Sequence, residues 1–311
     1  MTRATGHTLV LTSRPGAQEL TGDHLARASS AWAGHGDCGA RWLCAQEAWE
    51  TTLPGATADE ALQVANTVRA TLDGAFIDVN VVPADPATRR KRLLVCDMDS
   101  TIIEQECIDE MADMAGIKPQ IADITERAMR GELDFEAALR ERLRLLAGLE
   151  EAALARVYAE RIRLMAGAAT LTATMRAHGA FTALVSGGFS YFTSRVAKAA
   201  GFEANHANTL EIDQGRLTGG VVGPILGRQA KLDTLERYRR ELGLDIADTL
   251  AAGDGANDLA MIKAAGLGVA YRVKPLVAAE AQASIIHGDL TGLLYLQGYT
   301  RAEFAAAQGS G

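Results

Sequence analysis

The sequence predicts an α/β protein with a parallel sheet, a helical bundle inserted into that sheet domain, and a small α+β domain ahead of it. Two observations lead to this prediction. Beyond residue 90, short apolar runs bounded by polar residues alternate with helical periodicity, which is typical of buried parallel strands joined by helices. A long helical stretch, about 104–165, separates the first apolar run from the next. At 311 residues, the chain is long enough for two domains.

Composition narrows the class of protein. Apolar residues make up 48% and aromatic residues 5% of the chain, as expected for a helix-rich globular protein. The formal net charge of −8 argues against nucleic acid or an anionic membrane as a general partner. No apolar run reaches the ~18 residues of a membrane span, and the N-terminal apolar region is too short for a secretory signal, so we expect neither. The four cysteines lack zinc-ligand spacing, so we do not expect a zinc site. We expect a reduced, cytoplasmic protein.

The pattern of apolar residues over 1–86 predicts the small α+β domain. The expected elements are strands at 8–12 and 76–82, a further strand within 41–49, and helices at 17–32 and 57–72. No residue pattern in this domain indicates chemistry. A proline-containing break at 83–86 and the basic run 89–92 mark a linker. We interpret the basic run as a solvated strand entry rather than as a phosphate or nucleic-acid patch.

The segment Leu93–Thr101, LLVCDMDST, is the first strand of the predicted parallel sheet. Its apolar run stops at Asp97, and a second carboxylate follows at Asp99, where the strand gives way to a turn. Ligands of open α/β sheets bind beyond the carboxyl ends of the strands. Two acids at such a place are unfavourable unless a cation or a shared proton is present. Taken alone, the segment also fits an ordinary helix-capping turn.

The stretch 104–165 predicts several short helices, because Gly and Pro breaks separate its periodic segments. Inserted directly after the first strand, this bundle would lie over the carboxyl end of that strand, as a lid does. Residues 89–103 and 166–300 form the expected core. Its remaining elements are helices at 171–178, at 190–200 and from Arg228, strands at 181–185, 249–252, 268–270 and 284–286, and a hairpin over 205–222.

Four polar sites follow strand ends or begin a helix in this core. They are Asp97 with Asp99, Ser186 with Gly187, Lys231, and Asp254 with Asn257 and Asp258. Each alone fits a turn, a solvated lysine or a cap. Together they suit Mg²⁺, with carboxylates from Asp97 and Asp254 and a backbone carbonyl near Asp99. Ser186, the Gly187 amide and Lys231 are candidates to hold phosphate oxygens. The chain lacks the G-x-x-x-x-G-K-[ST] pattern of a P-loop.

The order DMDST, SGGF, Lys231 and GDGANDLAMI resembles the haloacid dehalogenase superfamily over about residues 92–295. The resemblance implies a Rossmann-like core and phosphoryl transfer through an aspartyl-phosphate. It implies that Asp97 is the nucleophile and that Asp99 is the general acid and base. It also implies that Asp254 completes the Mg²⁺ site and that Asp258 supports it.

The insertion narrows the resemblance to the phosphoserine phosphatases, through DMDSTIIEQECIDEMADMAG and LRERL. By this resemblance, Glu106 meets the substrate ammonium and Arg142 meets its carboxylate. Met129 and Phe135 would close the pocket, and Asn257 would reach the substrate. The alternative is that Glu106 and Arg142 are ordinary surface charges. The implied reaction is Mg²⁺-dependent hydrolysis of O-phospho-L-serine, the last step of L-serine biosynthesis.

Two other functions stay open. One is a phosphotransferase that passes phosphate from phosphoserine to another alcohol, such as homoserine. The other is a regulatory amino-acid-binding protein without turnover, which the intact set of acids and Lys231 disfavours. The N-terminal domain is similar in size to the ACT-like domain that precedes many phosphoserine phosphatases. Amino-acid sensing, formation of a homodimer and a spacer role all remain open for it.

Overall fold

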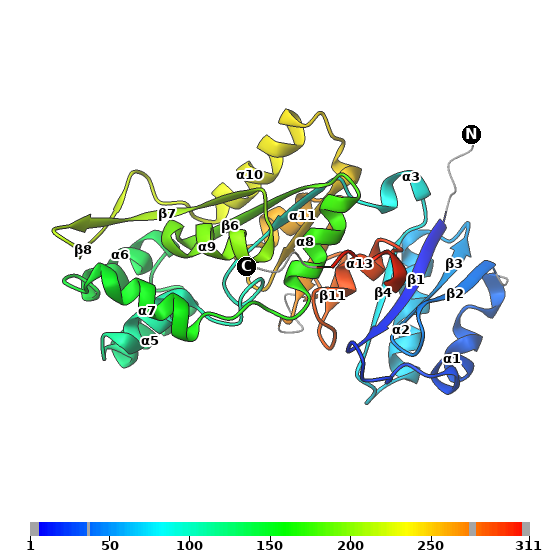
Figure 1. The fold of residues 1–311 in the computed structure, drawn as a ribbon. Coiled ribbons are helices and arrows are strands. Elements are labelled where there is room, and N and C mark those ends of the chain that lie inside the picture. The colour runs from blue at the N-terminus through cyan, green and yellow to red at the C-terminus, as the bar shows by residue number, and fades with distance from the viewer. Residues whose placement is uncertain (1–5, 36–37, 274–277, 307–311) are drawn as a thin grey trace.

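The computed structural model describes residues 6–35, 38–273 and 278–306 (Figure 1). It contains a four-stranded sheet built by the N-terminal part of the chain and a seven-stranded sheet built by the rest. A group of helices lies at the far end of the larger sheet from the N-terminal domain (Figure 1). In the described ranges, no helix combines the length and the apolar character needed to cross a membrane.

The N-terminal domain has the element order β-α-β-β-α-β. Its elements are β1 (Gly6–Ser13), α1 (Gly22–Ala28), β2 (Cys38–Cys44), β3 (Ala48–Pro54), α2 (Ala58–Thr71) and β4 (Ile77–Pro83). The sheet order is β2-β3-β1-β4, and all neighbours are antiparallel. The strands expected at 8–12 and 76–82 and the helix expected at 57–72 are confirmed.

The expected extents of one strand and one helix in this domain are wrong. The single strand expected within 41–49 is two strands, because the chain turns at Gln46, whose φ is +58°, and the Glu47 N–H donates to the Cys44 carbonyl. The helix expected over 17–32 is α-helical only in α1. There the Thr21 N–H donates to the His24 side chain at 3.2 Å, which sets the helix start, and a 3-10 turn, Ser29–Ala31, follows.

The N-terminal sheet is buried on both faces. Leu9 and Leu11 pack against the domain's own helices, whereas Val10 belongs to the main core of the protein together with Tyr295. This alternation is that of a strand whose successive side chains point to opposite faces. At the edge, the Asn80 carboxamide exchanges hydrogen bonds of 2.9 and 2.8 Å with the backbone of Ser284. Packing and hydrogen bonds thus join this domain to the core.

The larger sheet has the order β11-β10-β9-β5-β6-β7-β8. Its strands are β5 (Leu93–Cys96), β6 (Phe181–Phe189), β7 (Ala204–Asp213), β8 (Arg216–Val222), β9 (Thr249–Gly253), β10 (Leu267–Tyr271) and β11 (Ala283–Ile285). All pairings are parallel except that of β7 with β8, which form the expected hairpin. The predicted parallel sheet is therefore confirmed.

Strand β5 lies in the middle of this sheet, and helices cover it on both sides. The helices are α8 (Ala168–Ala177), α9 (Ser190–Ala200), α10 (Arg228–Glu241), α11 (Leu259–Ala264) and α13 (Gly292–Leu296). Leu94 and Cys96 pack in the cluster with α8, α9 and α13, whereas Leu93 and Val95 pack in the cluster with α10 and α11. Burial on both faces explains why this strand is an uninterrupted apolar run.

Four helices form the insertion, which we call the cap: α4 (Cys107–Met114), α5 (Lys118–Met129), α6 (Phe135–Leu145) and α7 (Glu151–Arg161). The two segments that connect it to the core pair with each other through a bridge between Ile103 and Leu164. Farther out, Leu217 of β8 exchanges backbone hydrogen bonds with Gly148 and Leu149, at 2.8 and 2.9 Å. The cap is thus attached to the core at two separated places.

Candidate active site

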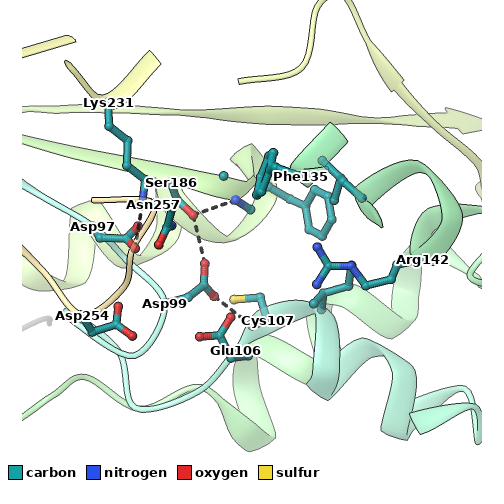
Figure 2. Close-up of a pocket in the computed structure, with 15 residues that line it drawn as sticks. Asp97, Asp99, Glu106, Cys107, Phe135, Arg142, Ser186, Lys231, Asp254 and Asn257 are labelled. Carbon is teal, nitrogen blue, oxygen red and sulfur yellow. Dashed lines mark hydrogen bonds and ion pairs between the residues drawn. The ribbon is translucent and has the colours of Figure 1, made fainter. Parts of the chain in front are cut away.

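Asp97 directly follows β5 at the carboxyl edge of the sheet. Its N–H donates to the Ala252 carbonyl at 3.0 Å, so the pairing with β9 continues one residue past the strand. The residue is 5% exposed, and its carboxylate accepts a hydrogen bond from the Met98 N–H at 2.7 Å. The strand and this local bond hold the carboxylate in a single direction, toward the space beyond the sheet (Figure 2).

Asp99 lies in the turn that follows. The N–H groups of Thr101 and Ile102 donate to the Met98 carbonyl, so the chain leaves the extended conformation before Asp99 can share a face with Asp97. The two oxygens of Asp99 are engaged separately. Oδ1 accepts from the Cys107 N–H and Oδ2 from the Ser186 hydroxyl, each at 2.9 Å (Figure 2). The turn thus gives the second carboxylate a position of its own.

Lys231, on the first turn of α10, joins two carboxylates. Its Nζ lies 2.7 Å from Asp97 Oδ2 and 2.6 Å from Asp258 Oδ1. The lysine is 2% exposed. Burial alone would lower the pKa of Lys231, but the facing charges of Asp97 and Asp258 outweigh it and raise this pKa above its usual range. Lys231 is therefore a permanent cation beside Asp97.

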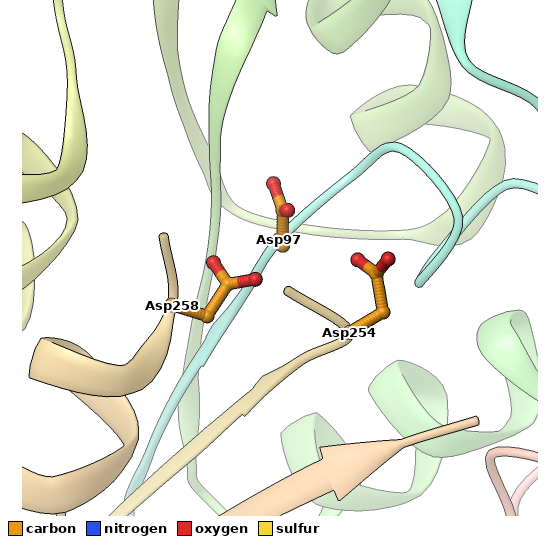
Figure 3. Close-up of side chains that lie close together, drawn as sticks. All are labelled: Asp97, Asp254 and Asp258. Carbon is orange, nitrogen blue, oxygen red and sulfur yellow. The ribbon is translucent and has the colours of Figure 1, made fainter. Parts of the chain in front are cut away.

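Asp97, Asp254 and Asp258 form an acidic cluster in which one oxygen from each lies within 4.8 Å of the others (Figure 3). Asp254 follows β9 and accepts a hydrogen bond from the Thr101 hydroxyl at 3.0 Å. Asp258 is fully buried against Gly253. A Cβ at position 253 would come within 2.4 Å of the Asp258 carboxyl carbon, so only glycine allows this approach.

The acidic cluster is electrostatically strained. Burial, and next the charge of Asp258, raise the pKa of Asp97 above its usual range, and Lys231 only partly opposes them. Burial and Asp258 also raise the pKa of Asp254 to about 6. A divalent cation among these oxygens would relieve the repulsion, and a donor set made only of oxygen suits Mg²⁺. The residues present therefore fit such an ion.

Ser186 and Gly187 lie in the C-terminal part of β6, on the opposite side of Asp99 from α4. The Ser186 hydroxyl oxygen accepts a hydrogen bond from the Gly188 N–H at 2.8 Å. The cap contributes the ring of Phe135 to the site (Figure 2), and this ring lies against Gly187. A Cβ at position 187 would come within 2.7 Å of the Phe135 ring, so the glycine is what lets the cap approach this loop.

The cap also brings one anion and one cation to the site. Glu106, just ahead of α4, accepts a hydrogen bond from the Ser100 hydroxyl at 2.7 Å. Its side chain is exposed and faces the cavity, where desolvation by the protein groups around it, and next repulsion from Asp99, raise the pKa of Glu106 to about 7. The Arg142 guanidinium donates to the Ala138 carbonyl at 3.3 Å and has no carboxylate within 4 Å among the described residues.

These groups line one cavity of about 190 Å³ between the core and the cap (Figure 2). The predicted residues in its lining are Asp97, Asp99, Glu106, Phe135, Arg142, Ser186, Gly187, Lys231, Asp254 and Asn257. Asp258 lies behind them, bonded to Lys231. Met129 ends α5, and its side chain lies outside the described part of the structure.

Some residues of the site escaped prediction. The Ser100 hydroxyl donates to Glu106, and the Thr101 hydroxyl donates to Asp254. Neither serine nor threonine was singled out, although they directly follow Asp97 and Asp99 in the sequence. Leu139 lines the cavity one helical turn before Arg142, so helical periodicity would have identified it. Asn208, described below, has no such signal.

The chain is similar to known phosphatases. The haloacid dehalogenase-like hydrolase family model matches residues 94–263. The phosphoserine phosphatase of Streptomyces coelicolor is 45% identical over 74% of this chain and 56% of that protein. That of Archaeoglobus fulgidus is 42% identical over 75% of this chain and 68% of that protein. The chain thus spans about half to two thirds of the length of these curated relatives.

A solved structure extends the likeness to the N-terminal domain. The probable phosphoserine phosphatase from Vibrio cholerae, in its unliganded form, has a TM-score of 0.75 and 32% identity. It covers 96% of this chain, and this chain covers 88% of it. The chain belongs to the haloacid dehalogenase-like hydrolases and, within them, to the phosphoserine phosphatase family.

Proposed function

We propose that the protein hydrolyses O-phospho-L-serine to L-serine and inorganic phosphate, the last step of L-serine biosynthesis. The observation that carries this proposal is that a single cavity joins Asp97 and Lys231 on the core side to Glu106 and Arg142 on the cap side. Phosphoserine carries a phosphate ester, an ammonium and a carboxylate. Asp97 with Lys231 matches the phosphate ester. The Glu106 carboxylate matches the ammonium, and the forked Arg142 guanidinium matches the carboxylate. The names of the relatives support the same substrate.

The proposed reaction has two steps. An Asp97 oxygen attacks phosphorus, the bond to the serine oxygen breaks, and the protonated Asp99 gives its proton to the leaving alkoxide. In the second step, the ionised Asp99 takes a proton from water, whose oxygen attacks the aspartyl-phosphate and releases phosphate from Asp97. Lys231, the Ser186 hydroxyl and the Gly187 amide hold the phosphoryl oxygens, because this transition state chiefly needs positioning and neutralised charge.

A Mg²⁺ ion would be held by the carboxylates of Asp97 and Asp254. The Asp99 side chain is not part of the acidic cluster, so its contribution to the ion would come from its backbone carbonyl. Asp258 would act from behind by fixing Lys231. When bound, the ion supplies positive charge that reduces the repulsion between the substrate phosphate and Asp97.

The wider organisation is proposed on the same basis. Residues 1–86 form the N-terminal domain, 89–103 and 166–300 the catalytic core, and 104–165 the cap. The β-α-β-β-α-β order supports an ACT-like N-terminal domain, and size-exclusion chromatography with and without L-serine tests both sensing and a homodimer. Free thiols at Cys44, Cys96 and Cys107 support a reducing, cytoplasmic location.

Phosphate release tests the function directly. The substrates are O-phospho-L-serine, phosphothreonine, phosphotyrosine and an aryl phosphate with Mg²⁺, and Asp97→Asn is the blank. We expect a strong preference for phosphoserine that is lost in the blank. Activity only on the other esters would contradict the amino-acid pocket, and silence on all of them would favour a binding protein. Added homoserine that captures the phosphoryl group in place of water would identify the phosphotransferase.

A further inference from the structure

The loop that holds Ser186 interrupts the pairing of two core strands. Val185 of β6 pairs with His206 of β7, and the next pair is Phe189 with Asn208. Three residues of β6, 186–188, therefore stand opposite a single residue of β7. Such a bulge leaves backbone groups without partners in the ladder, and buried backbone groups need partners.

Asn208 supplies those partners from its side chain, which is 3% exposed. Its Nδ2 donates to the Gly187 carbonyl at 2.8 Å and more weakly to the Leu226 carbonyl at 3.4 Å. Its Oδ1 accepts from the Leu226 N–H at 2.7 Å. Leu226 stands just ahead of α10, the helix that carries Lys231. One buried carboxamide thus ties the Ser186 loop to the approach of the lysine helix.

The bond to Gly187 determines which way the next peptide group points. The carbonyl of Gly187 and the N–H of Gly188 belong to one planar trans peptide and point in opposite directions. With the carbonyl held by Asn208, the N–H points to Ser186 Oγ, at 2.8 Å. That bond occupies a lone pair of the hydroxyl oxygen, so the hydroxyl proton points away from the peptide, here to Asp99 (Figure 2). When Asp99 is protonated, as in the proposed first step, the same proton is available to a phosphoryl oxygen.

Apart from the hydrogen bond between the Gly188 N–H and Ser186 Oγ, the backbone of the loop itself offers little resistance to rotation of this peptide. Both of its residues are glycine, which has no Cβ to restrict the backbone. After a half-turn, the carbonyl oxygen of Gly187 would face the side of Ser186, where the phosphoryl group is expected. A carbonyl oxygen repels an anion, whereas an N–H group attracts one.

We propose that Asn208 is a positioning residue for phosphoryl binding. It holds the Gly187–Gly188 peptide with its N–H on the hydroxyl oxygen of Ser186, and so directs the hydroxyl proton of Ser186 away from the loop. This inference rests on the proposed function, in which Ser186 holds phosphoryl oxygens. It predicts that loss of the Asn208 donor weakens the phosphate side of the cavity and leaves the amino-acid side intact.

Asn208→Asp tests this, because it keeps an oxygen for the Leu226 N–H and replaces the donor to Gly187 with an oxygen. The affinities of the Mg²⁺-loaded full-length protein for inorganic phosphate and for L-serine are measured separately by calorimetry. We expect the affinity for phosphate to fall about 10- to 100-fold and that for L-serine to change less than about threefold. The kcat/KM for phosphoserine is expected to fall about 100-fold.

Asn205→Asp is the matched control. Asn205 lies on the same strand, and its Oδ1 accepts from the Thr193 hydroxyl at 3.0 Å, away from the Ser186 loop. This variant is expected to keep both affinities. Equal losses of phosphate and L-serine binding in Asn208→Asp, or no loss of either, would overturn the proposal.

Asn208→Ala, which removes the donor without adding charge, gives the same comparison if the aspartate variant does not fold. If neither folds, Asn208 acts in stability and the proposal is wrong. Failure of the proposed function has a different signature, because the wild type itself would then release no phosphate from phosphoserine. The calorimetric comparison does not require turnover, so the two failures can be told apart.

Discussion

The core side and the cap side of the cavity differ in how their charged groups are held. On the core side, Lys231 is 2% exposed and contacts two carboxylates, and Asp99 has both oxygens engaged. On the cap side, Glu106 accepts one hydrogen bond from a hydroxyl, and the only hydrogen bond of the Arg142 guanidinium among the described residues goes to a carbonyl of its own helix. The groups proposed to react are thus fixed in advance, whereas the groups proposed to recognise the substrate are free to pair with the charges of a ligand.

The two sides also come from different parts of the fold. Strand ends and the start of α10 supply the core side, and the inserted helices supply most of the cap side. A substitution on one side should therefore leave the other side in place. This separation predicts that chemistry and selectivity can be removed independently.

Asp97→Asn should have the largest effect, a loss of about 10⁴-fold or more in turnover of every phosphate ester, because it removes the proposed nucleophile. Phosphate release measured at saturating substrate checks this. The melting temperature should not fall, since the change removes a buried charge from a crowded acidic cluster. Turnover within about tenfold of the wild type would contradict the role of Asp97.

Lys231→Met should come next. It leaves Asp97 and Asp258 without their cation, so we expect a loss of about 3–5 kcal/mol in the free energy of unfolding, measured by denaturant titration. We expect kcat to fall about 10²- to 10³-fold for all esters. Lys198→Met, at an exposed position of α9, is the control and should change neither quantity. Selective loss of phosphoserine turnover alone would assign Lys231 to recognition instead.

Arg142→Lys should raise KM for phosphoserine about 10- to 100-fold, because an ammonium cannot reproduce the forked contact of a guanidinium with a carboxylate. An aryl phosphate, which has no carboxylate for Arg142 to bind, should react as in the wild type. Arg140→Lys is the matched control, since Arg140 lies on the same helix and pairs with Glu136 at the surface. Equal effects of the two substitutions would place Arg142 outside the binding site.

The pH dependence should show the smallest effect. With a pKa of about 7, Glu106 is ionised above this value and becomes neutral as the pH falls through it. The kcat/KM for phosphoserine should therefore drop several-fold more than that for an aryl phosphate between about pH 8 and 6. The titrations of the phosphate group and of Asp254 affect both substrates alike, so they drop out of the ratio of the two kcat/KM values. In Glu106→Gln, the two profiles should run in parallel, and persistence of the difference would exclude Glu106 as its source.

The core side of the site was predictable because it is encoded locally. Each of its polar groups stands within a few residues of a strand end or a helix start, and the carboxyl ends of parallel strands share one edge. The parallel sheet followed from the same apolar runs. Residue-level roles on the cap side came from the resemblance, since nothing in the spacing of Glu106 and Arg142 places them opposite each other.

Other features depend on tertiary context. The turn between β2 and β3 was missed because Gln46 adopts a positive φ with no glycine, proline or asparagine beside it in the segment. Asn208 was missed because its role arises from the register between β6 and β7. The joining of the N-terminal sheet to the core was also unpredictable, since Asn80 and Ser284 lie 204 residues apart in the chain.

The separation of chemistry from selectivity is tested most directly by the double variant Glu106→Gln, Arg142→Lys. The measurement is the ratio of kcat/KM for O-phospho-L-serine to that for an aryl phosphate, in this variant and in the wild type. We predict that the ratio falls at least about 100-fold while turnover of the aryl phosphate stays within about threefold of the wild type. A parallel loss on both esters, or an unchanged ratio, would contradict the account.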